Sequence, residues 1–129
     1  MVVEPRYLLD TNICIYILDA VIPELRQRIE AVPVGSLVTS TIVIAELYAG
    51  LDLNNPVEMA QMAALLTAVP ALPFGADAAQ AYGRMPFKRA RFDRLIAAHA
   101  LAMNLIIVTA NPRDFTDIPN LRVEDWTRE

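Results

Sequence analysis

The sequence predicts an α/β fold, in which a parallel sheet is covered by helices on both faces. Short apolar runs, each bounded by turn residues, alternate along the chain with longer segments of helical periodicity. Strands that are separated by helices need crossover connections, which produce parallel pairing and a sheet covered on both faces. The chain has 129 residues with no repeat and no linker, so we expect one domain that spans residues 1–129.

The expected strands are the short apolar runs. The first run is followed by Asp10, and the fourth, LIIVT, ends at Thr109. Short apolar runs between turn residues are typical of strands. We expect strands at residues 6–9, 36–39, 71–74, 105–109 and 121–123.

Terminal residues mark several of the expected helices. Pro23 suits the first turn of the second helix. Ser40 or Thr41 is the expected N-cap of the third helix, and Gly50 lies near its end. Asp93 lies near the start of the last helix. We expect helices at residues 11–19, 23–31, 41–51, 57–69, 76–83 and 93–104.

The charge balance argues against broad electrostatic attraction for nucleic acid, with one local exception. The formal net charge is −4 and the sequence pI is about 4.9. The exception is the run RMPFKRARFDR, in which one acid lies among five cations. A solvated loop and helix start would explain this run equally well. The cations are Arg84, Lys88, Arg89, Arg91 and Arg94.

Composition also predicts a partner chain and a compartment. Apolar residues make up 55% of the chain, which is high for a small domain and indicates that another chain covers part of its surface. The longest apolar stretch, LIAAHALAMNLIIV, is too short to cross a bilayer, and we expect no membrane span and no signal peptide. Cys14 is the only cysteine, so no intramolecular disulfide can form, which is compatible with a reducing cytoplasm.

Two acids are placed at the edge where an open parallel sheet binds ligands. Asp10 directly follows the first strand, and Asp114 lies shortly after Thr109, which ends the fourth. Ligands of such sheets bind outside the carboxyl ends of the strands. Simpler roles are open to both acids, because Asp10 can cap the following helix and Asp114 can be a turn residue.

Two further acids interrupt apolar helical faces. No polar stripe contains Glu46 in TIVIAELYAGL, and Asp93 repeats the situation in RFDRLIAAHALAM. A carboxylate in such a place must be exposed, protonated, paired or bound to a metal, because burying an unpaired charge costs several kcal/mol. The simpler alternatives are a rim position for Glu46, and a helix cap or an ion pair with Arg89 or Arg94 for Asp93.

Four acids in these positions favour a site for a hard cation. Oxygen ligands and few carboxylates suit Mg²⁺ or Mn²⁺, which keep several waters and also bind substrate phosphate oxygens. Like charges repel when they are close, and a metal removes that cost while it orients a water. The reaction that such a site predicts is hydrolysis of a phosphodiester bond.

The segments that contain the acids are similar to the four acidic motifs of PIN-domain ribonucleases. They are LLDTN with Asp10, TIVIAEL with Glu46, FDRLIAAHAL with Asp93 and VTANPRDF with Asp114. The ending LRVEDW resembles that of the VapC toxins, the bacterial toxin–antitoxin branch of this family. The resemblance runs in order through residues 7–126.

The resemblance implies a PIN-like α/β/α sandwich that acts as an endoribonuclease toxin on RNA with Mg²⁺ or Mn²⁺. It also implies a homodimer and a VapB-type antitoxin whose tail covers the site. The catalytic, metal-holding carboxylates would be Asp10, Glu46, Asp93 and Asp114, and the supporting polar residues beside them would be Thr11, Asn12, Thr109 and Asn111.

One segment departs from the family pattern. Relatives usually have a longer, glycine-containing loop before the DxLIAAHAL helix, where this chain has the brief and basic MPFKRAR. Our hypothesis is that Lys88, Arg89 and Arg91 line the path of the RNA and contact its phosphates.

Two other function classes compete with the nuclease. A catalytically silent PIN-fold module that binds RNA or a protein could keep all four acids for antitoxin binding alone. An aspartyl phosphotransfer domain also gathers acids at strand ends, but it needs an acceptor aspartate at the end of a mid-domain strand, and neither VTS nor ALPF ends in one.

The remaining candidates are expected to be structural. His99 is the only histidine, and with no nucleophile motif such as G-x-S-x-G beside it we expect a helix residue with a local hydrogen bond. Cys14 is expected to be a small buried hydrophobe. Packing is the expected use of the aromatic residues Tyr48, Tyr82, Phe87, Phe92 and Trp126.

Overall fold

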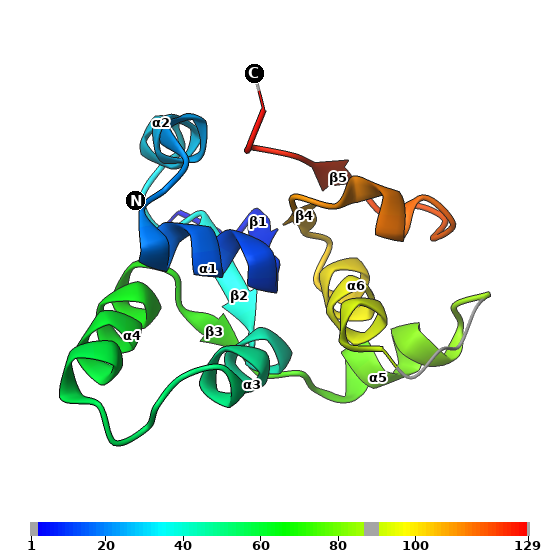
Figure 1. The fold of residues 1–129 in the computed structure, drawn as a ribbon. Coiled ribbons are helices and arrows are strands. Elements are labelled where there is room, and N and C mark those ends of the chain that lie inside the picture. The colour runs from blue at the N-terminus through cyan, green and yellow to red at the C-terminus, as the bar shows by residue number, and fades with distance from the viewer. Residues whose placement is uncertain (1–2, 87–90, 129) are drawn as a thin grey trace.

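The protein has a five-stranded parallel sheet with helices on either side (Figure 1). The structure is a computed structural model, which describes residues 3–86 and 91–128. The strand order is β3-β2-β1-β4-β5, and each neighbouring pair is parallel. The predicted fold class is therefore confirmed. The strands are β1 (Tyr7–Leu9), β2 (Leu37–Ser40), β3 (Ala71–Leu72), β4 (Ile106–Val108) and β5 (Val123–Glu124).

The helices lie where the sequence predicts them, within two residues at each end. The Ser40 side chain caps α3 by accepting a hydrogen bond from the Ile42 N–H, and Asn55 caps α4 in the same way. One short 3₁₀ helix, η1 (Pro112–Phe115), was not among the expected elements. The α-helices are α1 (Thr11–Asp19), α2 (Pro23–Ala31), α3 (Thr41–Ala49), α4 (Pro56–Ala68), α5 (Ala76–Gly83) and α6 (Phe92–Ala102).

The order of the strands determines which face each helix covers. The chain moves outward from β1 through β2 to β3, and then returns across the sheet to β4. Because such crossovers are right-handed, α1 to α4 cover one face, and α5 and α6 cover the other. Figure 1 shows α1, α2 and α4 on the left, α3 near the centre, and α5 and α6 on the right. The direction of winding thus reverses between β1 and β4, which is the point where open α/β sheets bind ligands.

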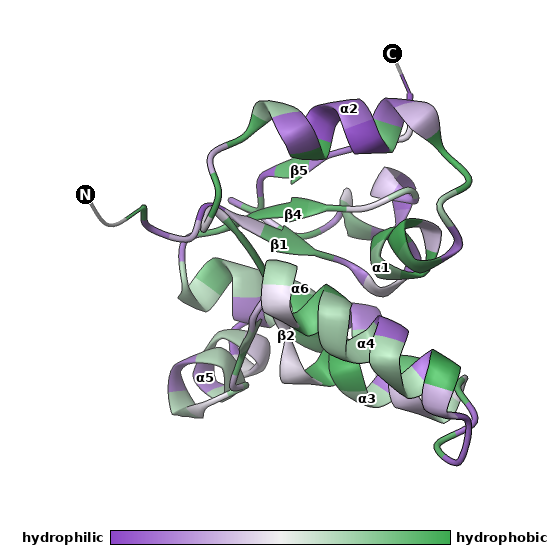
Figure 2. Ribbon diagram, turned by 90° about the vertical axis from the view of Figure 1, so that its left-hand side faces the viewer, coloured by the Kyte–Doolittle hydropathy of each residue, from purple (hydrophilic) through white to green (hydrophobic). Residues whose placement is uncertain are grey.

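The core lies between the central strands and the helices. Leu8 and Leu9 of β1 and Ile107 and Val108 of β4 are fully buried, as expected for strands that are covered on both faces. Figure 2 shows both strands mainly in apolar colours, and α2 mainly in hydrophilic colours. Cys14 is buried in this core as predicted, and burial raises the pKa of its thiol to about 12. Among the described helices, none is both long and apolar enough to span a bilayer.

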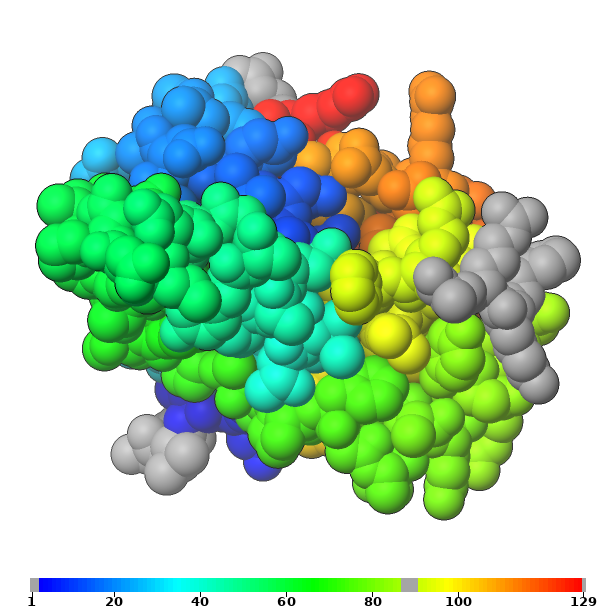
Figure 3. All heavy atoms as spheres, turned by 60° about the horizontal axis from the view of Figure 1, so that its bottom comes forward, coloured from blue at the N-terminus to red at the C-terminus, as the bar shows by residue number. Residues whose placement is uncertain are grey.

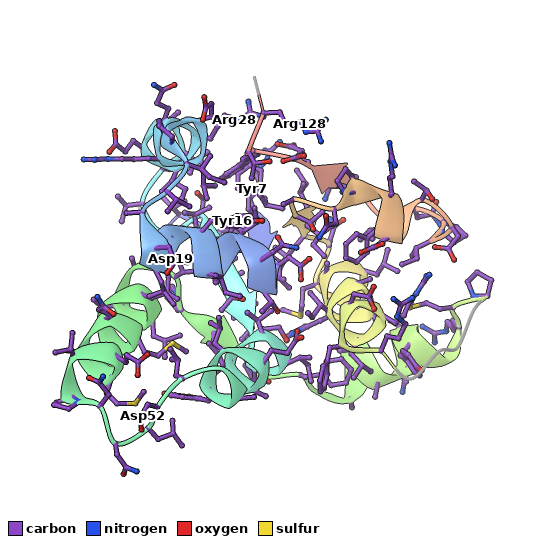
Figure 4. All side chains as sticks on the ribbon, in the orientation of Figure 1. Tyr7, Tyr16, Asp19, Arg28, Asp52 and Arg128 are labelled. Carbon is purple, nitrogen blue, oxygen red and sulfur yellow. The ribbon has the colours of Figure 1, made fainter. Side chains whose placement is uncertain are left out.

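The C-terminal segment packs back onto β1 and α2. Trp126 is buried, with its ring edge-on to Tyr7 at 4.9 Å between centroids and the Arg28 guanidinium 5.8 Å from its centroid. Figure 4 labels Tyr7 and Arg28 on the two elements that this ring joins. The indole N–H donates a hydrogen bond of 2.8 Å to Glu124, so the polar edge of the buried ring is satisfied. Packing is therefore the use of Trp126, as the sequence predicts.

Candidate active site

Asp10 lies at the carboxyl end of β1, beside the point where the winding of the sheet reverses. It is only 6% exposed. One carboxylate oxygen accepts a hydrogen bond of 2.8 Å from the Thr11 N–H at the start of α1, and the other accepts one of 2.8 Å from the Thr109 hydroxyl at the end of β4. Asp10 therefore caps α1, the simpler role, and also joins two strand ends at the candidate site.

The surroundings of Asp10 raise the pKa of its carboxyl group. Burial is the largest cause, because it penalises the charged form. The hydrogen bonds from Thr109 and the Thr11 N–H act in the opposite direction. The negative charges of Glu46 and Asp93 raise the pKa further, so both of these acids lie close enough to repel the Asp10 carboxylate. Of the other three predicted acids, Glu46 and Asp93 are therefore the two whose charges act on Asp10.

Glu46 reaches the site from α3. Its Oε1 accepts a hydrogen bond of 2.6 Å from the Thr11 hydroxyl, and its side chain is half-buried. The same threonine therefore donates its backbone N–H to Asp10 and its hydroxyl to Glu46. This contact explains why an acid occupies an otherwise apolar stretch of helix, and it places Thr11 between two predicted catalytic residues.

The other predicted supporting residues form a network on Thr109. Its hydroxyl oxygen accepts a hydrogen bond of 3.1 Å from the Asn111 N–H while it donates to Asp10. The Asn12 amide lies 3.5 Å from both Asp10 and Thr109, and its carbonyl oxygen accepts a bond of 3.0 Å from the Ala110 N–H. Thr109 and Asn12 act through their side chains, whereas Asn111 acts through its backbone.

Asp93 and Asp114 approach the site from the opposite side. Asp93 lies in the first turn of α6, where it is half-buried and accepts a hydrogen bond of 2.9 Å from the Arg94 N–H. Asp114 is exposed on η1, and its charge acts on Arg94. Figure 3 shows α1, α3, α6 and the segment around η1 meeting on one face of the molecule.

The four carboxylates do not form a closed metal cage. Within residues 3–86 and 91–128, no three His, Cys, Asp or Glu side chains lie close enough together to hold an ion. The donor chemistry still fits Mg²⁺ or Mn²⁺, since Mg²⁺ commonly binds through one or two carboxylates and completes its shell with water and substrate phosphates. Burial is the main cause of the raised pKa of Asp10, and the negative charges of Glu46 and Asp93 add to it; a bound cation would offset that repulsion. The metal-holding role of these acids stays a prediction.

Arg94 and Asp117 form an ion pair that the sequence did not predict. The two guanidinium nitrogens of Arg94 each lie 2.9 Å from a different Asp117 oxygen. This hydrogen bonding raises the pKa of Arg94 against the opposing effect of desolvation, and the charges of Asp93 and Asp114 add to the rise. In the sequence, Arg94 is part of the basic run and a possible ion-pair partner of Asp93. No local pattern indicated that it would pair with Asp117, 23 residues away.

His99 makes a long-range contact, so the expected local hydrogen bond is wrong. Its Nδ1 lies 2.8 Å from the Ser40 hydroxyl, 59 residues away in the chain. This contact forms because α6 packs against α3, which brings Ser40, the cap of α3, within reach of the ring. Burial lowers the pKa of His99.

The basic run and its aromatic residues are only partly described. Lys88, Arg89 and Phe87 lie outside the described residues. Arg91 is exposed at the N-terminal end of α6. Packing is the wrong expectation for Phe92, which is 54% exposed beside Asp93. Tyr48 is also exposed, while Tyr82 packs against the core.

Comparison with known proteins identifies the family of this chain. Residues 7–121 match the PIN domain family. This chain belongs to the PIN domain family. The chain is 32% identical to the tRNA(fMet)-specific endonuclease VapC of Shigella flexneri, over 95% of this chain and 98% of that protein. It is 31% identical to ribonuclease VapC2 of Rickettsia felis, with the same coverage. The resemblance to the VapC branch is therefore confirmed.

Solved structures give the same result for the fold of this PIN domain. VapBC from Salmonella typhimurium, solved with bound DNA, contains a chain with a TM-score of 0.83 and 28% identity, covering 95% of this chain and 98% of that one. VapBC2 from Rickettsia felis, bound to a DNA fragment from its promoter, has a TM-score of 0.80 and 27% identity over 96% and 99% of the two chains. The match extends over nearly the whole PIN domain, so its sheet and helices are those of VapC proteins.

Proposed function

We propose that this PIN domain is a Mg²⁺- or Mn²⁺-dependent endoribonuclease toxin that hydrolyses RNA phosphodiester bonds. The observation that carries the proposal is the placement of Asp10, a buried acid where the winding of the sheet reverses. The negative charges of Glu46 and Asp93 act on its carboxyl group. Ligands of open α/β sheets bind at such a point. Relatives named as ribonucleases support the choice of RNA as the substrate.

We assign the metal to the carboxylates of Asp10, Glu46, Asp93 and Asp114. When bound, the ion would activate a water and stabilise the charge that develops on the phosphate. The chain's own hydrogen bonds keep its ligands in place: Thr109 and the Thr11 N–H hold the two oxygens of Asp10, and the Thr11 hydroxyl holds Glu46. A ligand held by such partners loses less freedom when it binds.

The RNA phosphates require cations that this acidic protein has in few places. Arg91 is exposed one residue before α6, which carries Asp93, and it is our candidate for a phosphate contact together with Lys88 and Arg89. Replacing all three with alanine should reduce the salt dependence of RNA binding. An unchanged slope would exclude them from the path.

The proposed partners are a second copy of the chain and a VapB-type antitoxin. The similar solved structures are complexes of a VapC-type chain with its antitoxin, which supports the antitoxin as a partner. An apolar groove of about 470 Å³ between α1, α2 and α4 offers the antitoxin a place to bind. Its lining includes Ile17, Leu18, Ile29, Val32 and Leu65. We place the toxin in the cytoplasm, which suits a single buried thiol.

A catalytically silent module that binds RNA or a protein is the second candidate. One observation favours it: among the described residues, no three His, Cys, Asp or Glu side chains are placed so that they could hold a metal ion. Such a module would bind its partner without turnover, and replacing one acid by its amide would change binding alone.

Turnover by the purified protein tests the proposal. Free of its partner, the protein should cut RNA with Mg²⁺ or Mn²⁺, lose this activity in EDTA and lose it again in Asp10→Asn. Asp19→Asn is the matched control, since Asp19 is exposed at the end of the same helix, α1. Direct attack by water predicts 5′-phosphate and 3′-hydroxyl ends. A cyclic phosphate product, or equal activity in Asp10→Asn, would contradict the mechanism.

A further inference from the structure

Arg94 and Asp117 tie the first turn of α6 to the segment that follows η1. Both hydrogen bonds of the pair are 2.9 Å long, and each joins one guanidinium nitrogen to one carboxylate oxygen. This two-pronged geometry fixes the relative orientation of the two groups as well as their separation. The pair is uneven in exposure, with 8% for the Arg94 side chain and 35% for that of Asp117.

Stability alone does not account for this arginine. Covering a guanidinium removes its hydration, and an apolar side chain of similar size in such a place is often equally or more stable. The Nε–H of Arg94 is buried and has no hydrogen-bond partner among the described residues, which adds a further cost. The exposed pair Arg26–Glu30 on α2 lacks these costs, with side chains 82% and 64% exposed.

Each end of the pair is next to a predicted metal-holding acid. Asp93 directly precedes Arg94, and its carboxylate accepts the Arg94 N–H. Asp114 lies three residues before Asp117 on the turn that Phe115 and Ile118 anchor in the core. The two apolar anchors hold the turn against the core, while the ion pair is the polar contact that links the turn to α6. The charges of both acids act on Arg94.

We propose that Arg94 is a positioning residue, which fixes the Asp114 turn against α6 through Asp117 and so sets the separation of Asp93 and Asp114. This inference rests on the proposed nuclease function, because it concerns the spacing of two of its acids. Arg94 touches neither metal nor RNA in this role. Its effect passes through Asp117 and the short turn between Asp114 and Asp117.

Three variants and one control test the inference. Arg94→Met removes the guanidinium and keeps an apolar side chain of similar length. Arg94→Lys keeps the positive charge but cannot form the two parallel hydrogen bonds. Asp117→Asn removes the negative charge of the more exposed partner. Arg26→Met is the matched control, because it removes an ion pair on α2, a helix that carries none of the four acids. For each we would measure kcat for RNA cleavage, Mn²⁺ binding by electron paramagnetic resonance without RNA, and the melting temperature.

A positioning role and a structural role predict different results. If Arg94 positions the turn, Arg94→Met and Asp117→Asn should each lower kcat and weaken Mn²⁺ binding about tenfold. Tm should stay close to that of wild type in Arg94→Met, whereas Asp117→Asn should lower it, because the buried guanidinium loses its counter-charge. Arg94→Lys should not restore the activity, and the double variant Arg94→Met/Asp117→Asn should be no worse than the more affected single one. Arg26→Met should match wild type.

Two outcomes overturn the inference, and they differ. If the wild type cuts RNA and binds Mn²⁺ and the variants match it in both measurements, the positioning role alone is overturned. Wild type that does neither overturns the nuclease proposal and the positioning role with it. If Arg94→Met fails to fold, Arg94→Lys decides, because it keeps a cation beside Asp117 and removes only the paired hydrogen bonds of the guanidinium.

Discussion

The hydroxyl of Thr11 donates a hydrogen bond of 2.6 Å to Glu46, 35 residues away in the chain. Thr11 also donates its backbone N–H to Asp10, so one residue at the start of α1 orients two predicted catalytic acids. The contact needs β1 and α3 in their final places, and it gives a direct test of how far the acids depend on their hydrogen-bond partners.

Thr11→Val should lower RNA cleavage by a factor of about 10 to 100, because Glu46 loses the donor that orients it. Valine has nearly the same shape, and the Thr11 N–H that binds Asp10 remains. Thr11→Ser keeps a hydroxyl and should retain most of the activity. The comparison is made on kcat at saturating Mn²⁺, with circular dichroism as the check on folding. Equal activity in Thr11→Val and wild type would remove Thr11 from the site.

Asp10→Asn should raise the melting temperature of the metal-free protein at pH 7 by a few degrees while it abolishes cleavage. The pKa of Asp10 is raised in the folded state, chiefly by burial, so folding favours the neutral form. The stability that this preference contributes is present at low pH and is lost as the pH rises through the folded pKa. Asparagine stays neutral and avoids that loss.

The pH dependence separates this effect from a general change in packing. In EDTA, the difference in Tm between Asp10→Asn and wild type should shrink as the pH falls from 7 toward 4, because Asp10 then becomes protonated. Asp19→Asn on the same helix provides the baseline. A variant that is less stable than wild type at pH 7 would mean that ionised Asp10 does not destabilise the fold.

His99 should titrate below the ordinary histidine value of about 6.5, because it is buried and only 1% exposed. Ser40 Oγ accepts the Ile42 N–H and can donate its own proton to His99 Nδ1, so we predict that the ring proton is on Nε2. Since the sequence has one histidine, its nitrogen resonances can be assigned without ambiguity by NMR. A proton found on Nδ1, or a pKa at or above 6.5, would contradict this arrangement.

The lowered pKa of His99 also has a consequence for stability. A histidine that folding keeps neutral contributes stability above pH 6.5, and that contribution is lost as the pH falls below this value. In His99→Asn the side-chain oxygen can replace Nδ1 as the acceptor for Ser40. We expect this variant to be less stable than wild type at pH 8 and to lose less stability between pH 7 and pH 5. Thermal denaturation at each pH measures both quantities.

Ile29→Glu should weaken binding of the VapB-type antitoxin at least tenfold, because it places a charge in the apolar groove between α1, α2 and α4. Ile29 is half-buried on α2, a helix that carries none of the four acids, so cleavage by the free protein should persist. Val21→Glu is the control, since Val21 is apolar, 61% exposed and outside the groove lining. Co-purification with the antitoxin and calorimetric titration measure the effect, and undiminished affinity in Ile29→Glu would place the antitoxin elsewhere.

The candidate site was predictable to the extent that its signals are local. Asp10 and Asp114 were predicted because the sequence indicates where strands end. Glu46 and Asp93 were predicted because each interrupts an apolar helical pattern. The partner of Arg94 had no such signal, since Asp117 lies in an irregular segment where no repeat predicts which way a side chain points. For the same reason, the Ser40 contact of His99 was not expected.

The sequence by itself indicated the fold class, the positions of the helices and strands and the four candidate acids. These follow from periodicity, capping and turn chemistry, which act over a few residues. The polar residues beside the acids were implied by the resemblance to PIN-domain ribonucleases. Only the tertiary structure decided which charges act on one another: those of Glu46 and Asp93 act on Asp10, while that of Asp114 acts on Arg94. Contacts such as Thr11 with Glu46 and Ser40 with His99 join residues 35 and 59 positions apart. Their geometry depends on how whole helices pack on the sheet, and no local pattern encodes that packing.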